Sequence, residues 1–223
     1  MDTTFPNEID GVKILKFLGK GRGGYSYLVN YSSREAVLKK MHYEKCDVYN
    51  FPPDKLKAEI RDYTTLSKLQ LPIPRLLYYS REKQYLIKEY IDGPTCAELV
   101  ARGRLPDFCY DQIKIMCKAL YDNKLNIDFM PHNFALKGSQ LYYIDYECNQ
   151  YSAEWDFEHW GVFFWVNKNG MRKQLRTGDH RFLSRDGKPL INRRLKKRLR
   201  MYFQDLISLF LMATFMIKLL FTG

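Results

Sequence analysis

The sequence predicts an α+β protein with two lobes, in which an antiparallel sheet with one helix precedes a mainly helical half. A chain of 223 residues, 46% of them hydrophobic, is long enough to bury a core as one large domain or as two small lobes. The first ninety residues contain short apolar runs separated by glycine and other turn residues, which is typical of strands. From Pro94 onward the apolar spacing becomes helical, so we expect the boundary at 90–94.

The first half is predicted element by element from its apolar runs and its breakers. A proline pair precedes a stretch with apolar residues at helical spacing, and the turn "IDG" closes the half at 91–93. The predicted elements are strands 12–18, 25–30 and 35–41, the helix 52–69, and strands 76–79 and 85–90.

The second half is predicted as helices 107–123 and 154–167 with strands 134–136 and 141–145 between them. Trp155, Trp160 and Trp165 belong to the second helix and are expected in the core. The resulting divisions are the sheet lobe 1–91, the helical lobe 92–166, a basic segment 167–200 and an apolar helix 201–223.

The cysteines and the first residues favour the cytoplasm. The five cysteines are odd in number and include no C-x-x-C pair, which is typical of reduced thiols and unlike a disulfide framework or a zinc site. The opening "MDTTFPNEIDGVKILKFLG" places acids before any apolar run and does not resemble a signal peptide.

The basic charge is concentrated in one segment. Residues 167–200 hold thirteen basic and two acidic residues, which accounts for the whole net charge of +11. Such a segment attracts phosphate-bearing surfaces, either nucleic acid or anionic lipid headgroups. The apolar run 206–221 that follows is either a helix buried against the protein or a membrane anchor with a basic cytoplasmic flank. We therefore expect a cytoplasmic protein, with attachment of 193–221 to an anionic membrane face as one alternative and nucleic-acid binding as a weaker one.

A glycine-rich hairpin is predicted between the first two long strands. "LGKGRGGYSYLV" places Gly19, Gly21 and Gly24 as G-x-G-x-x-G between two strands, whereas a dinucleotide-binding site needs a helix next. One interpretation is an ordinary hairpin. The other is a loop that folds over a nucleotide, because glycines let main-chain N–H groups approach phosphates.

Four motifs in order resemble protein-kinase-like phosphotransferases over about residues 10–165, which implies a two-lobed kinase-like fold that uses ATP and Mg²⁺. "LGKGRGGYSYLV" is similar to the glycine-rich loop, with Ser26 where valine is usual, and "AVLKK" is similar to V-A-I-K. "LIKEYIDGPT" resembles the hinge that faces adenine, and "DFMPHN" with "YIDYE" resembles the catalytic loop and the metal-binding segment. The residues implied for cofactor binding are Gly19, Lys20, Gly21, Gly24, Lys39, Glu59, Glu89 and Ile91.

The resemblance implies a role for each of these polar residues. Lys39, rather than Lys40, contacts phosphates, and Glu59 on the helix is its ion-pair partner. Asp128 orients the acceptor hydroxyl or takes its proton, and Asn133 and Asp145 are the Mg²⁺ ligands. Asp156, in "DFEHWGV", fastens the catalytic loop from beneath, and His132 and His159 are expected to satisfy local hydrogen bonds.

Departures from the common kinase pattern narrow the subclass. Asn126 and Ile127 replace the histidine and arginine of H-R-D, and ten residues separate Asp145 from Asp156 without an A-P-E motif. The chain in this respect resembles lipopolysaccharide, RIO and PRPK-like kinases and small bacterial serine/threonine kinases. "IDYE" also resembles choline and aminoglycoside kinases, in which comparison Glu147 is either metal-associated or a surface acid.

The expected function is phosphoryl transfer from ATP to a protein hydroxyl by an atypical serine/threonine kinase. Two alternatives stay open, namely a small-molecule kinase with a metabolite hydroxyl as acceptor and a membrane-associated pseudokinase that acts as a scaffold.

Overall fold

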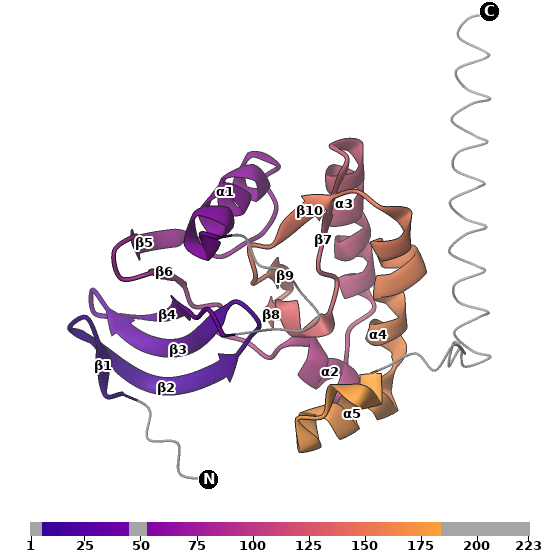
Figure 1. Cartoon of the computed structure of the whole chain (residues 1–223). Helices are drawn as coiled ribbons and strands as arrows, with labels where there is room; N and C mark the ends of the chain where they lie inside the picture. The colour runs from indigo at the N-terminus through magenta and orange to yellow at the C-terminus, as the bar shows by residue number, and fades with distance from the viewer. Residues whose placement is uncertain (1–5, 45–52, 184–223) are drawn as a thin grey trace, which may run out of the picture. The chain divides into compact units, whose positions relative to one another are not determined.

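Six antiparallel strands form one curled sheet in the first half of the protein (Figure 1). The computed structural model describes residues 6–44 and 53–183. The strand order is β1-β2-β3-β4-β6-β5, with helix α1 between β4 and β5 in the sequence. The bounds are β1 Glu8–Ile9, β2 Val12–Lys20, β3 Gly24–Tyr31, β4 Arg34–Met41, α1 Lys55–Lys68, β5 Leu76–Ser80 and β6 Tyr85–Glu89.

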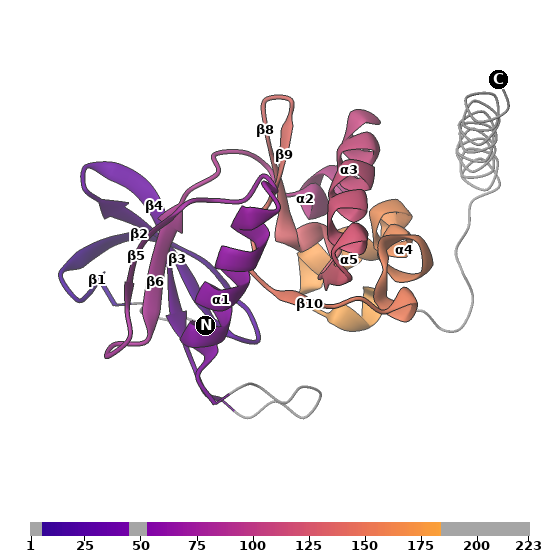
Figure 2. The ribbon, with the colours of Figure 1, turned by 90° about the horizontal axis from the view of Figure 1, so that it is seen from above.

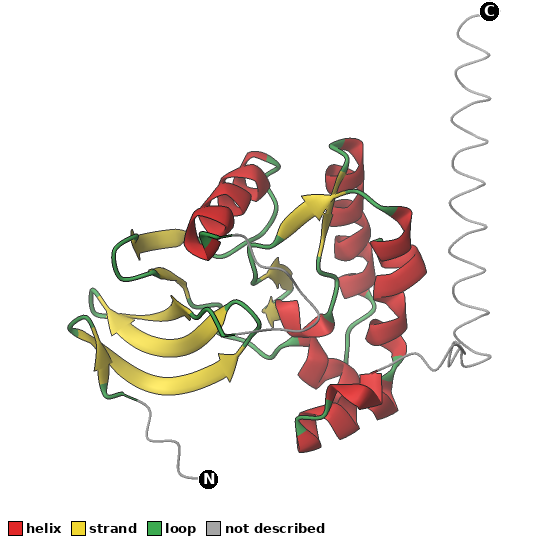
Figure 3. Ribbon diagram, in the orientation of Figure 1, coloured by secondary structure: helices red, strands yellow, loops and turns green. Residues whose placement is uncertain are grey.

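The second half mixes helices with short strand pairs, as the red and yellow segments of Figure 3 show. Strands β8 and β9 form one antiparallel pair, and β10 pairs with β7. The bounds are α2 Cys96–Arg102, α3 Phe108–Asp122, β7 Leu125–Ile127, η1 Pro131–Asn133, β8 Phe134–Lys137, β9 Gln140–Tyr143, β10 Cys148–Gln150, η2 Ala153–Trp155, η3 Phe157–Gly161, α4 Val162–Val166, α5 Lys168–Thr177 and η4 His180–Leu183.

The two faces of the sheet have different partners because successive strand residues point to opposite faces. Alternate residues of β3, β4 and β6, among them Val29, Leu38 and Ile87, form one apolar cluster. On the other face Leu86 packs with Leu56 of α1 and with Tyr146 from the second half. Helix α1 thus lies along the sheet on the side of the second half (Figure 2), and this face of the sheet carries the candidate site.

The second half has a continuous core around Phe129, Phe134 and Trp165, to which α3 contributes Ile113 and Leu120. A smaller cluster joins α2, α4, α5 and η4 through Val100, Phe164, Met171 and Leu183. Contacts between residues divide the chain after Leu183, and all described residues belong to the first of the two units.

Most predicted elements are confirmed, with ends that differ by a few residues. The helix predicted over 52–69 begins at Lys55, because the Asp54 side chain accepts a hydrogen bond from the Lys57 N–H and caps it. The single helix predicted over 154–167 is wrong. Asp156 has an extended backbone that interrupts it, and the segment consists of η2, the π-helical η3 and α4. The strand predicted over 141–145 ends at Tyr143, which leaves Asp145 in a loop.

Two further findings concern the cysteines and the character of the helices. Four cysteines in the described part of the chain, Cys96, Cys109, Cys117 and Cys148, are buried free thiols, as expected. Within residues 6–44 and 53–183, none of the helices has the length and apolar character needed to cross a bilayer. The apolar run 206–221 and the basic run from 193 lie outside the described residues.

Candidate active site

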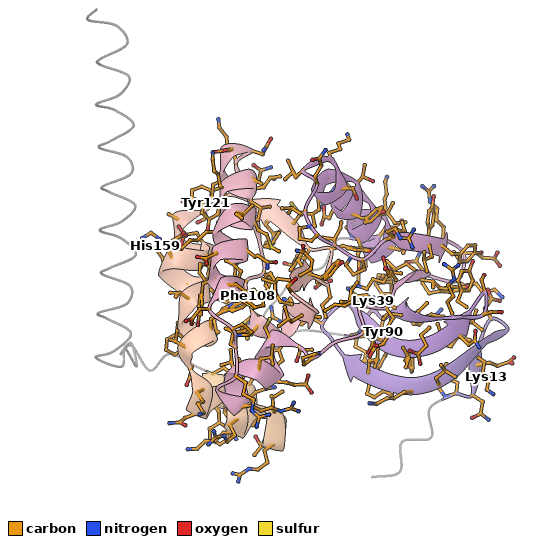
Figure 4. All side chains as sticks on the ribbon, turned by 180° about the vertical axis from the view of Figure 1, so that it is seen from behind. Lys13, Lys39, Tyr90, Phe108, Tyr121 and His159 are labelled. Carbon is orange, nitrogen blue, oxygen red and sulfur yellow. The ribbon has the colours of Figure 1, made fainter. Side chains whose placement is uncertain are left out.

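One lysine joins three segments that are far apart in the sequence. The ammonium of Lys39 on β4 lies 2.7 Å from Oε1 of Glu59 on α1 and 3.0 Å from Oδ1 of Asp145 in the loop after β9. The three side chains are 14%, 11% and 26% exposed, respectively, so the cluster is largely shielded from water but open at Asp145. Figure 4 labels Lys39 at the border between the sheet and the second half.

The alternation of β4 explains why Lys39, and not Lys40, reaches this cluster. Leu38 is fully buried on one face of the sheet, so the next side chain points to the opposite face, where α1 lies. Lys40 points to the same face of the sheet as Leu38, and its ammonium donates a hydrogen bond to the main-chain carbonyl of Lys83. Lys39, and not Lys40, is therefore the lysine that lies in this cluster.

The three charges of the cluster support one another. Burial disfavours the Lys39 ammonium, but the carboxylates of Asp145 and Glu59 outweigh burial and raise its pKa. Burial likewise opposes ionisation of Asp145, yet Lys39, with a smaller contribution from Lys88, lowers its pKa to about 2. Asp145 is therefore a carboxylate, and Lys39 an ammonium, across the physiological pH range.

The segment 128–133 lies beside the Asp145 loop. The Asp128 Oδ1 accepts a hydrogen bond of 3.0 Å from the Met130 N–H, and the Asn133 side-chain amide donates one of 3.3 Å to the Asp128 carbonyl. The Ile144 N–H donates to the Asn133 carbonyl at 2.8 Å, which joins this segment to the residue before Asp145. The segments that bear Asn133 and Asp145 are therefore adjacent.

Asp128 is electrostatically coupled to its surroundings. Burial raises its pKa, the Met130 N–H opposes that rise, and the negative charge of Asp145 adds to it. The positive charge of Arg22, in the turn between β2 and β3, lowers it slightly. The glycine hairpin, Asp128 and Asp145 therefore lie within electrostatic range of one another.

The segment that bears Asp128 is held from below by Trp165, and not by Asp156 as we expected. The indole N–H of buried Trp165 donates a 2.7 Å hydrogen bond to the carbonyl of Phe129. The Asp156 carboxylate instead accepts hydrogen bonds from the His159 N–H at 2.7 Å and from the Tyr151 hydroxyl at 3.2 Å. Its role is to cap η3, and its side-chain hydrogen bonds to other described residues do not reach 128–133.

The glycines of the hairpin fall into two kinds. A Cβ on Gly24 would lie 2.6 Å from the Lys40 carbonyl oxygen, so the close approach of β3 to β4 requires glycine there. A Cβ on Gly19 would meet nothing within 4 Å, and one on Gly21 only the Gly24 oxygen at 3.7 Å. Packing therefore explains Gly24 but not Gly19 or Gly21. Lys20 is about half exposed and pairs with Glu44 on the surface.

The predicted hinge follows β6. The Glu89 N–H donates to the Arg75 carbonyl at 2.9 Å, and its carboxylate lies 3.3 Å from Arg75 Nε. Ile91 is buried, and no hydrogen bond joins its main chain to another described residue. Of the two hinge residues, only Glu89 has its main-chain N–H bonded to another described residue.

Two further polar side chains near the site have local partners. His132 shares a 2.8 Å hydrogen bond with the Gln174 side chain, which supports a structural role, and burial lowers its pKa. Glu147 accepts a 3.0 Å hydrogen bond from the Asn149 side chain, while burial raises its pKa.

Sequence reasoning missed Lys88, a buried lysine on β6. Its ammonium donates a 2.6 Å hydrogen bond to the Ile144 carbonyl and lies 4.6 Å from the centre of the Tyr146 ring, so it contacts both neighbours of Asp145. Burial lowers the pKa of Lys88, and the positive charge of Lys39 adds to this effect, so that the pKa is about 8. Strand alternation could have found it, because Lys88 shares its face with Leu86, which packs against α1.

Comparison with protein-family models gives no match, and comparison with curated proteins gives none either. In residues 6–44 and 53–183, no three or more His, Cys, Asp or Glu side chains gather into a metal site.

Proposed function

We propose that the protein is a kinase-like phosphotransferase that moves the γ-phosphate of ATP to a hydroxyl group with Mg²⁺, acting as an atypical serine/threonine protein kinase. The observation that carries the proposal is the contact of Lys39 with both Glu59 and Asp145. Phosphoryl transfer depends mainly on positioning and on compensation of negative charge, and a lysine fixed by a helix glutamate next to a metal-binding aspartate supplies both.

The donor groups suit Mg²⁺, which prefers a few hard oxygen ligands and completes its shell with substrate phosphates and water. Asp145 is ionised, and the Asn133 side-chain nitrogen is used by the Asp128 carbonyl, which leaves the amide oxygen for a cation. These two residues would hold the ion. Bound Mg²⁺ would neutralise charge on the phosphate oxygens.

Each of the other residues contributes through its own chemistry. Lys39 offers a fixed positive charge to the phosphates, and Glu59 keeps it in place. Asp128 has a raised pKa, which makes it a better proton acceptor than an ordinary surface aspartate. Gly19 and Gly21 carry no side chain, so the N–H groups at these two positions can approach phosphates.

The acceptor is proposed as a protein hydroxyl, with a small-molecule hydroxyl as the alternative. The ten residues between Asp145 and Asp156 favour the alternative, because they include β10, which is paired with β7, and η2. They therefore leave little chain for binding a peptide. Transfer from labelled ATP to a protein panel and to a panel of amino alcohols and aminoglycosides separates the two.

Two asparagine variants test the proposal. Asp128→Asn should lower transfer about 10²–10⁴-fold while nucleotide affinity is kept, because only the proton acceptor is lost. Asp145→Asn should instead weaken Mg²⁺-dependent nucleotide binding, measured by calorimetry with and without Mg²⁺. Asp111→Asn, at a 59% exposed acid on α3, is the matched control and should behave like the parent. Full activity in both site variants would refute the assignments.

The scaffold alternative predicts a different result with the same protein. A pseudokinase would bind ATP without transferring phosphate to itself, to proteins or to metabolites. Binding without turnover in the full chain would therefore replace the enzyme proposal with the scaffold one, whereas absence of both would overturn the nucleotide-binding proposal itself.

A further inference from the structure

Four arginines line one hollow on the surface formed by α2 and α5. The hollow has a volume of about 650 Å³ and is lined by Ala101, Arg102, Arg104, Arg172, Leu175 and Arg176. Arg172 and Arg176 are one helical turn apart on α5 and share a face. In Figure 4 nitrogen-tipped side chains project from this part of the ribbon, at the bottom of the view.

The internal contacts of these arginines do not account for their convergence. Arg172 donates two 3.2 Å hydrogen bonds to the Ala101 carbonyl, and Arg102 lies 4.0 Å from the Glu98 carboxylate. Arg104 and Arg176 are exposed and have no ion-pair partner among the described residues. A cation in the last turn of a helix is common, because it interacts favourably with the helix dipole. This accounts for the position of Arg102 or of Arg176 taken alone, but not for four arginines together. Four cations around one hollow without an acid in its lining repel one another, so an external anion would stabilise the arrangement.

The chemistry of the lining specifies the anion. Guanidinium groups bind phosphate through paired N–H donors, and arginine is favoured over lysine where this geometry matters. Leu175 within the lining is 43% exposed, and Phe182 on the adjoining η4 is 40% exposed. Exposed apolar side chains beside cations are typical of proteins that bind at a membrane surface, whereas single-stranded nucleic acid is usually bound by aromatic side chains among cations. The hollow itself contains no aromatic residue.

We propose that this arginine hollow binds the phosphate of an anionic phospholipid headgroup, with Leu175 and Phe182 entering the interfacial layer. The site is separate from the Lys39 cluster and does not depend on phosphoryl transfer. It would hold the described part of the protein on a membrane surface without a membrane-spanning helix.

The test uses the full chain with Arg104→Gln and Arg176→Gln combined, one change from each side of the hollow. Binding is measured by flotation with phosphatidylcholine vesicles that do or do not contain phosphatidic acid. At about 1 kcal/mol for each basic residue near the surface, the double variant should bind phosphatidic acid vesicles about 10- to 30-fold more weakly. The control Lys13→Gln with Lys16→Gln removes the same charge from exposed positions on β2 and should change binding less than about threefold.

Further measurements separate the sources of phosphate. Arg104→Lys with Arg176→Lys keeps the charge but loses paired donation, so it should regain only part of the affinity. Soluble glycerol phosphate and a short RNA serve as competing probes. Unchanged vesicle binding by the glutamine variant would overturn the proposal, as would arginine-dependent binding of glycerol phosphate or RNA without vesicle binding. Phosphoryl transfer should be the same in all these variants, so failure here is distinct from failure of the proposed function.

Discussion

Replacement of Lys88 by methionine should stabilise the protein while it weakens the site. Methionine has a similar length, keeps a favourable contact with the Tyr146 ring, and carries no charge. The fall of the Lys88 pKa from 10.5 to about 8 means that holding the charged amine in the fold costs about 3 kcal/mol, at about 1.4 kcal/mol per pKa unit. The lost hydrogen bond to the Ile144 carbonyl offsets about 1 kcal/mol. The net gain should be about 2 kcal/mol near neutral pH.

The sign of the pH dependence follows from the lowered pKa. Between about pH 8 and pH 10.5 the unfolded chain binds the Lys88 proton and the folded protein does not, so parental stability rises through this window. The methionine variant lacks that rise. Its advantage should therefore be complete below about pH 8 and shrink by about 2 kcal/mol between pH 7.5 and pH 9.5.

Urea unfolding at these two pH values, without added metal, measures the effect. Lys137→Met, at an exposed position on β8, is the control and should show no such change with pH. Mg²⁺-dependent nucleotide binding by Lys88→Met should be weaker, because Ile144, the residue before Asp145, loses its hydrogen bond from β6. A variant that is less stable than the parent at neutral pH, or a difference that does not vary with pH, would refute the reasoning.

Two more predictions concern the glycine hairpin and the indole beneath the 128–133 segment. Gly24→Ala should lose about 1–3 kcal/mol of unfolding free energy, because its Cβ would collide with the Lys40 carbonyl. Gly21→Ala should keep its unfolding free energy within about 0.5 kcal/mol of the parent but bind nucleotide more weakly. Equal effects of the two on stability would contradict this division. Trp165→Phe keeps an aromatic ring but leaves the Phe129 carbonyl without its donor, which should cost about 1–3 kcal/mol and lower transfer more than nucleotide binding. Thermal unfolding measures the loss of stability in Trp165→Phe, and a comparison of kcat with KM measures the effect on transfer. An unchanged kcat would contradict the proposal that Trp165 supports the 128–133 segment.

The sequence was sufficient where local pattern decides the structure. The strands of the sheet follow from apolar runs and turns. The contact of Lys39 with Glu59 was expected only from the resemblance of the motifs, and it is present in the structure. The support of the 128–133 segment was not predictable in this way. Whether Trp165 or Asp156 holds the 128–133 segment depends on how the chain around Asp156 is broken into short helices, and tertiary packing decides that.

Lys88 was missed for a related reason. A lysine within a strand is usually read as exposed, since burial of a charged amine is costly unless it is paired. Here the face that Lys88 shares with Leu86 is covered by α1 and by Tyr146, and Tyr146 is 58 residues further along the chain. Only the tertiary structure shows that the face is covered.

Charge burial in the site is difficult to explain by stability alone. Lys39, Glu59, Asp145 and Lys88 bring two cations and two anions to one face of the sheet, and Lys88 has no carboxylate within ion-pair distance among the described residues. Buried ion pairs replaced by apolar side chains of similar volume are often as stable or more stable, and an unpaired buried cation is costlier still. The apolar neighbours Leu56 and Leu86 show that this face can be filled by hydrocarbon. A fold that keeps four charged side chains on this face is less stable than one that fills the face with hydrocarbon. This loss of stability is explained if the charges position and neutralise a phosphate-bearing ligand. Lys88→Met separates these two effects, because it should raise stability and lower ligand binding in the same protein.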